Sequence, residues 1–236
     1  MFTAPGAVSK VCEAYHRAAG ESRFGRTAEP MTHLLECAPF RDAYLNIRSQ
    51  LFIHPPRWQR AHHGSLPRSR IDLTTASWLF EPGSLTQRLR RLVGQGFRVV
   101  LLGQSWQKPG MDEARQLGLK PGHRAIVREV ALQNGSQVLV VARSIIPART
   151  LRGADRRLAN LGSRPLGHIL FADPRLQRLQ LQLARVVPDD WQPELFTDQA
   201  PRTIIWGRRS LYSLGPEHKL LVAEFFLPPL FQVSDS

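Results

Sequence analysis

The sequence predicts an α+β domain built on a six-stranded, largely antiparallel sheet with a few helices. Six short segments are either continuously apolar or alternate between apolar and polar residues, as strands do. Short links join neighbouring segments, and one of these links contains Asn134-Gly135, a pair favoured in tight hairpin turns. Helical spacing occurs only in a few short stretches between the strand-like segments.

The elements become clear from about residue 78 onwards. The expected strands are Phe97–Gly103, Arg124–Leu132, Gln137–Ile145, Leu179–Leu183, Trp206–Leu214 and Leu220–Leu227. The expected helices are one through Leu85, Leu89 and Leu92 that Ser84 or Thr86 can cap, one near Met111–Leu119, and one at Leu151–Leu161 with Gly162 just past its end. Pro228 and Pro229 are expected to end the last strand.

At 236 residues, the chain can hold one domain of ordinary size, with or without an extension. Residues 1–70 lack a sustained period and are interpreted as an N-terminal extension, partly loop-like, to which we assign no role. Residues 71–231 form the expected principal domain, and residues 232–236 form a tail. The histidines of the stretch 54–67 have no carboxylate or cysteine at ligand spacing, so a surface loop is favoured over a metal site.

Composition restricts the classes of function. The formal net charge is +13, but nearly all of the 32 basic residues are arginines scattered along the chain, which favours a solvated surface over a specific nucleic-acid site. No apolar run reaches the roughly eighteen residues of a membrane span, and the N-terminus does not look like a secretory signal. Cys12 and Cys37 have no metal-like spacing. We therefore expect a reduced, cytoplasmic, monomeric protein without a transmembrane segment or a metal.

A single carboxylate, Glu224, lies within the apolar run Leu220–Leu227. An ionised carboxylate in a buried strand costs several kcal/mol unless it is paired or hydrogen-bonded. Glu224 therefore requires a partner inside the protein, which can be an arginine, a hydroxyl-bearing ligand or both.

Arginines on the expected strands are candidate partners. Arg128 shares one side of its strand with Ile126, Val130 and Leu132, so it is an arginine on an apolar face. Two interpretations stay open for it. One is a core ion pair, for example with Glu224, and the other is an anion-binding guanidinium that grips a carboxylate.

Three more arginines extend this pattern. Arg143 lies among apolar residues of its own strand, so each arm of the hairpin is expected to bring one arginine inward. Arg208 and Arg209 are adjacent and must point to opposite faces, so one of them is expected to be exposed and the other to point to a pocket. A buried acid with several inward arginines suits a small ligand with two carboxylates. In agreement, the chain has no phosphate-binding loop, dinucleotide fingerprint, Gly-x-Ser-x-Gly elbow or metal-spaced histidine pair.

Six segments in a fixed order resemble the chorismate lyases, the chorismate–pyruvate lyase family. They are Trp78-Leu79 with Gly83-Ser84-Leu85-Thr86, Val127-Arg128-Glu129-Val130, Ala142-Arg143-Ser144-Ile145-Ile146-Pro147, Arg164-Pro165-Leu166-Gly167 with Leu170-Phe171, Trp206-Gly207-Arg208-Arg209-Ser210, and Ala223-Glu224-Phe225-Phe226-Leu227-Pro228. The resemblance implies a six-stranded antiparallel sheet with helical flaps over an internal ligand site. It also implies cofactor-free cleavage of chorismate to 4-hydroxybenzoate and pyruvate, the first step of ubiquinone biosynthesis.

The resemblance further implies which residues hold the aromatic product. The corresponding positions are Arg128, Glu224 and the backbone at Leu85 and Leu166. We expect Arg128 to grip the ring carboxylate, whereas Glu224 hydrogen-bonds the 4-hydroxyl and either moves the proton lost from the adjacent carbon or only holds the ring. Arg128 and Glu224 are thus the expected catalytic residues. Arg208 or Arg209 is expected at the pyruvyl end, and the sequence does not choose between them.

Two parts of the chain depart from the family pattern. Residues 1–70 have no counterpart in the matched segments, and the stretch between Phe171 and Trp206 is longer than expected, with Pro188–Pro193 as an inserted loop. The alternative function is a non-catalytic effector-binding sensor domain on the same fold, of the kind attached to bacterial transcription regulators. Such a protein should carry a winged helix-turn-helix ahead of the sensor, and residues 1–70 show no convincing recognition helix.

Overall fold

The structure is a computed structural model, and it describes residues 51–52, 54–61, 71–153, 158, 161–191 and 202–234. All of them belong to one compact unit, Ala43–Ser236. Some expectations lie outside these residues, namely those on Cys12 and Cys37, most of the later part of the helix expected at Leu151–Leu161, and the end of the expected inserted loop.

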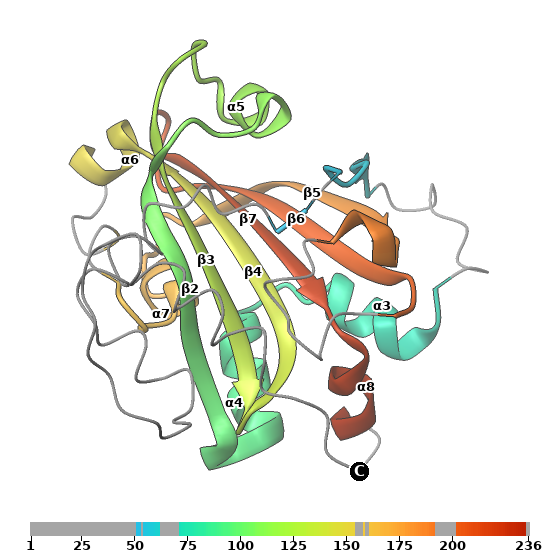
Figure 1. Ribbon diagram of the computed structural model, residues 1–236. Helices are drawn as coiled ribbons and strands as arrows, with labels where there is room; N and C mark the ends of the chain where they lie inside the picture. The colour runs from blue at the N-terminus through green and yellow to red at the C-terminus, as the bar shows by residue number, and fades with distance from the viewer. Residues whose placement is uncertain are drawn as a thin grey trace, which may run out of the picture. The chain divides into compact units, whose positions relative to one another are not determined.

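An antiparallel sheet of seven strands forms the centre of the fold, in the order β1-β5-β6-β7-β4-β3-β2 (Figure 1). The strands are β1 (Gln59–Arg60), β2 (Phe97–Gln107), β3 (Ala125–Asn134), β4 (Gln137–Pro147), β5 (Gln177–Val186), β6 (Ile205–Ser213) and β7 (Lys219–Phe226). The α+β class and all six expected strands are confirmed. The expected count misses β1, a two-residue edge strand that is too short to show a period and lies in the stretch interpreted as a loop.

The hairpin of β3 and β4 forms at the expected turn. Gly135 has a φ of +59°, which a residue with a Cβ rarely adopts, and its N–H donates to the carbonyl of Gly96 at 2.8 Å. Asn134 is the last residue of β3 and pairs with Gln137, so the two-residue loop consists of Gly135 and Ser136. The turn thus lies one residue later than its Asn-Gly signal suggests.

Six α-helices are described beside the sheet. They are α3 (Leu73–Leu79), α4 (Leu85–Val93), α5 (Met111–Leu117), α6 (Ala148–Gly153), α7 (Leu166–Leu170) and α8 (Pro228–Ser234), with 3₁₀ turns η2 (Gly94–Gly96) and η4 (Pro188–Asp190). The helix expected behind Ser84 is confirmed as α4, because the Ser84 hydroxyl accepts from the N–H of Gln87. The sequence did not predict α3, α7 or α8. No described helix has the length and apolar character needed to cross a membrane.

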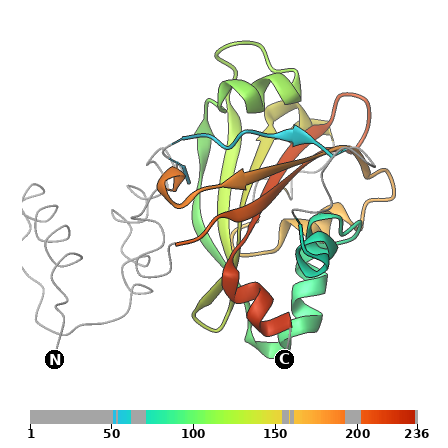
Figure 2. The ribbon, with the colours of Figure 1, turned by 90° about the vertical axis from the view of Figure 1, so that its right-hand side faces the viewer.

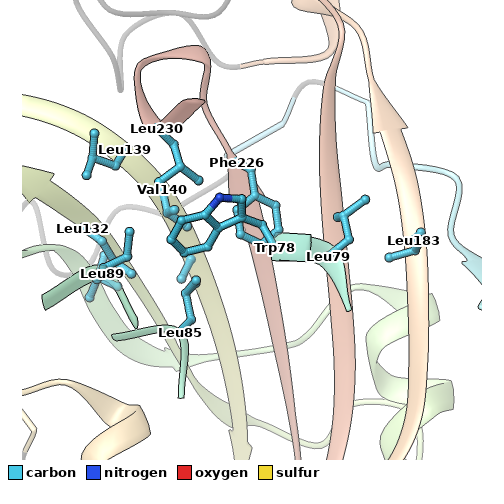
Figure 3. Packing of buried hydrophobic residues seen from close by; sticks show 12 residues of the cluster. Trp78, Leu79, Leu85, Leu89, Leu132, Leu139, Val140, Leu183, Phe226 and Leu230 are labelled. Atoms are coloured by element: carbon cyan, nitrogen blue, oxygen red, sulfur yellow. The ribbon is translucent and has the colours of Figure 1, made fainter. Parts of the chain in front are cut away.

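Helices and sheet share a core that buries Trp78. This side chain of α3 is 2% exposed and lies with Phe226 of β7, Leu85 and Leu89 of α4, and Leu230 of α8 (Figure 3). α3, α4 and α8 therefore pack on one face of the sheet, which we call the cavity face. Figure 2 shows α4 and α8 beside each other at one end of the strands.

The opposite face is covered by α5 and by residues 51–52 and 54–58. Phe225 of β7 meets the rings of Phe52, Trp58 and Trp191, with ring centroids 4.7–5.8 Å apart. Gly207 on β6 makes room for this cluster, since a Cβ there would lie 2.6 Å from the Phe225 ring. Both faces of the sheet are thus buried, and part of the region before residue 71 contributes to the packing. The domain limits remain a prediction.

Candidate active site

A cavity of about 50 Å³ lies between the cavity face and helices α4 and α7. The polar side chains along its wall belong to Thr86, Arg128, Ser144, Arg208, Tyr212 and Glu224. Apolar groups of β2, β3, β4, β7, α4 and α7 complete the lining. An apolar wall with a few convergent polar groups is typical of a small-molecule site.

Strand register brings the polar groups together. Arg128 of β3 pairs with Ser144 of β4, while Ala142 of β4 pairs with Glu224 of β7, which also pairs with Arg208 of β6. Because alternate residues share a face, all of these side chains point to the cavity face. Arg128 and Glu224 lie two strands and two residues apart, so strand spacing and rise place their Cα atoms roughly 12 Å from each other.

Arg128 is buried without a counter-charge. Its guanidinium is 1% exposed and donates from Nη2 to the carbonyls of Gly162 (2.9 Å) and Arg164 (3.0 Å). Its Nε is buried without a partner, and no carboxylate of the described residues lies within ion-pair distance. Burial lowers the pKa of Arg128 to about 10, so the group remains charged at neutral pH. The core ion pair with Glu224, one of the two interpretations of Arg128, does not form.

Glu224 pairs instead with Arg208. The Arg208 Nε donates to Glu224 Oε2 at 2.6 Å, and the two side chains are 1% and 12% exposed. Arg208 Nη1 also donates to the carbonyls of Trp78 and Glu81, both at 3.0 Å. Burial alone would lower the pKa of Arg208, but the charge and hydrogen bond of Glu224 outweigh it and raise the pKa, so the guanidinium stays protonated.

Arg209 lies on the opposite face of the sheet and is 2% exposed, so the expectation that one of the two arginines is exposed is wrong, because that face is buried as well. Its Nε donates to Gln182 Oε1 (2.8 Å), its Nη1 to Asp112 Oδ2 (2.5 Å), and its guanidinium lies 4.6 Å from the centroid of the Trp58 ring. The choice that the sequence left open is therefore decided, because of these two arginines only Arg208 borders the cavity.

Arg143 also lies on the opposite face, and the expectation that each hairpin arm brings an arginine inward is wrong. Arg143 donates to Glu113 Oε1 (2.8 Å) of α5 and to Glu129 Oε1 (2.5 Å) of β3. The physical reason is that Arg143 pairs in register with Glu129 rather than with Arg128. Its apolar neighbours Val141 and Ile145 are buried, but they belong to the second buried face.

This charge cluster under α5 perturbs both of its glutamates. Desolvation raises the pKa of Glu129, which is fully buried, and the charge of Arg143 only partly opposes that rise. Burial also acts on Glu113, but the charge and hydrogen bonds of Arg143 outweigh it and lower the pKa. The cluster attaches α5 to β3 and β4 away from the cavity.

Leu85 and Leu166 are the first residues of α4 and α7 and both border the cavity. N–H groups in the first turn of a helix have no acceptor within the helix, which leaves them available to a ligand. The two helix starts also touch, since a Cβ on Gly167 would lie 3.0 Å from Ser84 Oγ. The absence of a side chain at Gly167 thus allows α7 to approach α4.

Comparison with known proteins identifies the family of the chain. Residues 55–235 match the family model "Chorismate lyase". The chain belongs to the chorismate lyase family. Two relatives are named "Probable chorismate pyruvate-lyase": one from Methylococcus capsulatus is 48% identical over 160 residues (68% of this chain, 98% of the relative), and one from Aromatoleum aromaticum is 42% identical over 171 residues (71% and 91%). The solved structure of PhnF from Mycobacterium smegmatis is similar with a TM-score of 0.48 and 15% identity, covering 92% of this chain and 94% of that one.

All four positions that the resemblance to chorismate lyases picks out, Arg128, Glu224, Leu85 and Leu166, border the same cavity. Sequence reasoning missed Tyr212, which lines the cavity four residues after Arg208 on the same face of β6. The strand period could have found it, because residues i and i+4 of a strand point the same way.

Proposed function

We propose that this chorismate lyase family member cleaves chorismate to 4-hydroxybenzoate and pyruvate. The observation that carries the proposal is Arg128, a charged guanidinium that is buried beside a cavity and has no carboxylate partner among the described residues. A buried charge of this kind requires an anion, and a ligand carboxylate matches the planar fork of arginine. The family relationship makes the ring carboxylate of chorismate the matching ligand group.

The opposite end of the cavity suits the 4-hydroxyl group. Glu224 uses Oε2 for Arg208, and its Oε1 has no hydrogen-bond partner among the residues of the described ranges. An ionised carboxylate only accepts hydrogen bonds, so Glu224 is suited to receive one from a hydroxyl. The distance between the two strands that carry Arg128 and Glu224 leaves room for a single ring between the head groups.

The reaction requires the ether C–O bond to the enolpyruvyl group to break and the neighbouring carbon, which bears the hydroxyl, to lose its proton. The electrons of that C–H bond complete the aromatic ring, and the enolpyruvyl fragment takes up a proton as it becomes pyruvate. In this proposal Arg128 and the N–H groups of Leu85 and Leu166 fix the ring carboxylate. Glu224 orients the hydroxyl and lies beside the carbon that loses its proton, where it can act as the base.

Arg208 is the proposed cation for the second carboxylate. Its Nε and Nη1 are occupied by Glu224 and by two carbonyls, whereas Nη2 has no partner in the described part of the chain. An Nη2 donor beside Glu224 would hold the pyruvyl carboxylate near the bond that breaks and would oppose the charge that develops on the leaving oxygen. Arg209 has no place in this proposal, because it lies on the other face.

Several broader expectations belong to the same proposal. The catalytic unit comprises residues 71–231, works without a metal or organic cofactor, and supplies 4-hydroxybenzoate to ubiquinone biosynthesis in the cytoplasm. These follow from family membership and from the composition of the chain.

The direct test is to incubate the purified chain with chorismate, without metal or nucleotide, and to follow 4-hydroxybenzoate and pyruvate together. We expect equal amounts of both products, and we expect Arg128→Ala and Glu224→Gln each to lower turnover by orders of magnitude. Arg185→Ala is the matched control, because Arg185 is exposed on β5, lies 5.9 Å from the centroid of the Trp206 ring and has no hydrogen bond or ion pair among the described residues. A folded protein that binds chorismate but forms no product would favour the effector-binding alternative.

A further inference from the structure

Arg178 of β5 does not line the cavity, yet it contacts the connector that leads into α4 and one side chain of the cavity wall. Its Nη2 donates to the carbonyls of Glu81 (2.9 Å) and Pro82 (3.3 Å), in the connector between α3 and α4. The same nitrogen donates to the hydroxyl of Tyr212 (3.1 Å), whose side chain does line the cavity. One guanidinium thus joins the connector to the sheet.

Two arginines hold the connector, residues 80–84, by donating hydrogen bonds to its carbonyl groups. Arg208 donates to the Glu81 carbonyl that also accepts from Arg178. The Glu81 carboxylate accepts from the N–H of Gly83 (2.9 Å) and pairs with Arg88 (3.1 Å), which closes the segment on itself. The connector then leads directly into Ser84, the cap of α4, and so fixes where that helix begins.

The contact of Arg178 with Tyr212 connects Arg178 to α7, the second helix beside the cavity. The Tyr212 ring lies edge-on to Phe171, with ring centroids 6.2 Å apart, and Phe171 is the residue that ends α7. The Arg178 guanidinium lies 5.5 Å from the centroid of the Tyr212 ring. Arg178 therefore contacts the connector that leads into α4, and it contacts Tyr212, which packs on the residue that ends α7.

The bonding of Arg178 is not that of a surface ion pair. Within the described ranges no carboxylate pairs with it, its Nε is buried without a partner, and its hydrogen bonds go to carbonyls and one hydroxyl. A cation that donates to two successive carbonyls restricts the backbone between them more than a neutral donor would.

We infer that Arg178 is a positioning residue of the lyase site. It holds the 80–84 connector and Tyr212 so that the N–H of Leu85 stays at the cavity opposite the Glu224–Arg208 pair. This inference rests on the proposed function. Loss of Arg178 should weaken the grip on the ring carboxylate without removing any group that touches the ligand.

The test compares Arg178→Ala, Arg178→Lys and Tyr212→Phe with Arg185→Ala, a control that removes the same charge from an exposed position on the same strand. Hydrogen–deuterium exchange of the ligand-free proteins should be faster at residues 79–93 in Arg178→Ala and unchanged in β3. The dissociation constant of 4-hydroxybenzoate should rise by about tenfold, and KM with it, while kcat changes by less than about threefold. Arg178→Lys should restore part of the affinity, because an ammonium can still donate to the carbonyls.

Unchanged exchange at residues 79–93 in Arg178→Ala would overturn the inference. An unchanged dissociation constant would do the same, as would faster exchange spread evenly over the sheet, which would indicate only a stability role. These results differ from a failure of the proposed function, in which the wild-type protein itself neither binds 4-hydroxybenzoate nor forms product. The exchange comparison needs no ligand and tests the contact of Arg178 with the connector by itself.

Discussion

Replacing Arg208 by methionine removes one half of the buried ion pair and keeps a side chain of similar length. The guanidinium is 1% exposed, and Glu224, which would lose its partner, is 12% exposed. Removing one member of a buried pair costs about 3–5 kcal/mol in unfolding free energy, because the other charge remains without compensation. The slight exposure of Glu224 admits some water, so we expect the lower end, about 3 kcal/mol, and a fall in Tm of roughly 6–12 °C for a domain of this size.

Urea unfolding followed by tryptophan fluorescence measures this loss. The series comprises Arg208→Met, Glu224→Gln, the double variant and the control Arg185→Met, which should change the unfolding free energy by less than about 0.5 kcal/mol. The double variant should be more stable than the sum of the single changes predicts, by about 2 kcal/mol, because it leaves no unpaired carboxylate. Additive single changes, or a loss below about 1 kcal/mol in Arg208→Met, would refute the reasoning.

Three further predictions concern the cavity and the opposite face. Burial lowers the pKa of Arg128 to about 10 and a bound carboxylate would raise it again, so benzoate should bind at full strength below pH 10 and progressively less above it. Calorimetry that shows constant affinity from about pH 8 to about pH 11 would exclude Arg128 as the anion site. Gly167→Ala places a Cβ 3.0 Å from Ser84 Oγ, so the contact of α7 with α4 should loosen and 4-hydroxybenzoate should bind a few times more weakly, with Tm almost unchanged; equal affinity in equilibrium dialysis would contradict this. Folding lowers the pKa of Glu113, so the stability that this carboxylate contributes is present above its unfolded pKa and is lost as the pH falls through its folded pKa. Folding raises the pKa of Glu129, so the stability of the protein declines as the pH rises through the folded pKa of that group. Glu113→Gln should therefore cost about 1–3 kcal/mol at pH 7 and Glu129→Gln less than about 1 kcal/mol, and the reverse order in urea unfolding would show that the assignment is wrong.

The sequence predicts the strands well because apolar runs and the hairpin signal at Asn134-Gly135 are local. It also predicts which residues share a face of a strand, and Arg128 does lie with Val130 and Leu132 on the cavity wall. Alternation does not tell which of two faces holds the cavity. Both faces of this sheet are buried, so Arg143 has apolar neighbours as well and the pattern could not separate it from Arg128.

The partner of Glu224 could not be predicted from the sequence for a different reason. An acid in a buried strand predicts some partner, but the choice of Arg208 depends on the β6–β7 register, which sequence reasoning did not define. The short helix α7 was missed because five residues are too few to show a helical period. The cavity wall is therefore predictable where it is made of long strands and not where it is made of short helices.

Charged residues lie side by side on opposite faces at two places in the sheet. Arg128 precedes Glu129 on β3, and Arg208 precedes Arg209 on β6; the first of each pair borders the cavity and the second joins the cluster under α5. A one-residue deletion ahead of Arg128 would put Glu129 at the anion site, and a one-residue insertion ahead of Gly207 would put that glycine, in place of Arg208, opposite Glu224. These strands can therefore accept changes of side chain but not of length, whereas the two-residue loop after β3 is the place where an added residue would leave both faces intact.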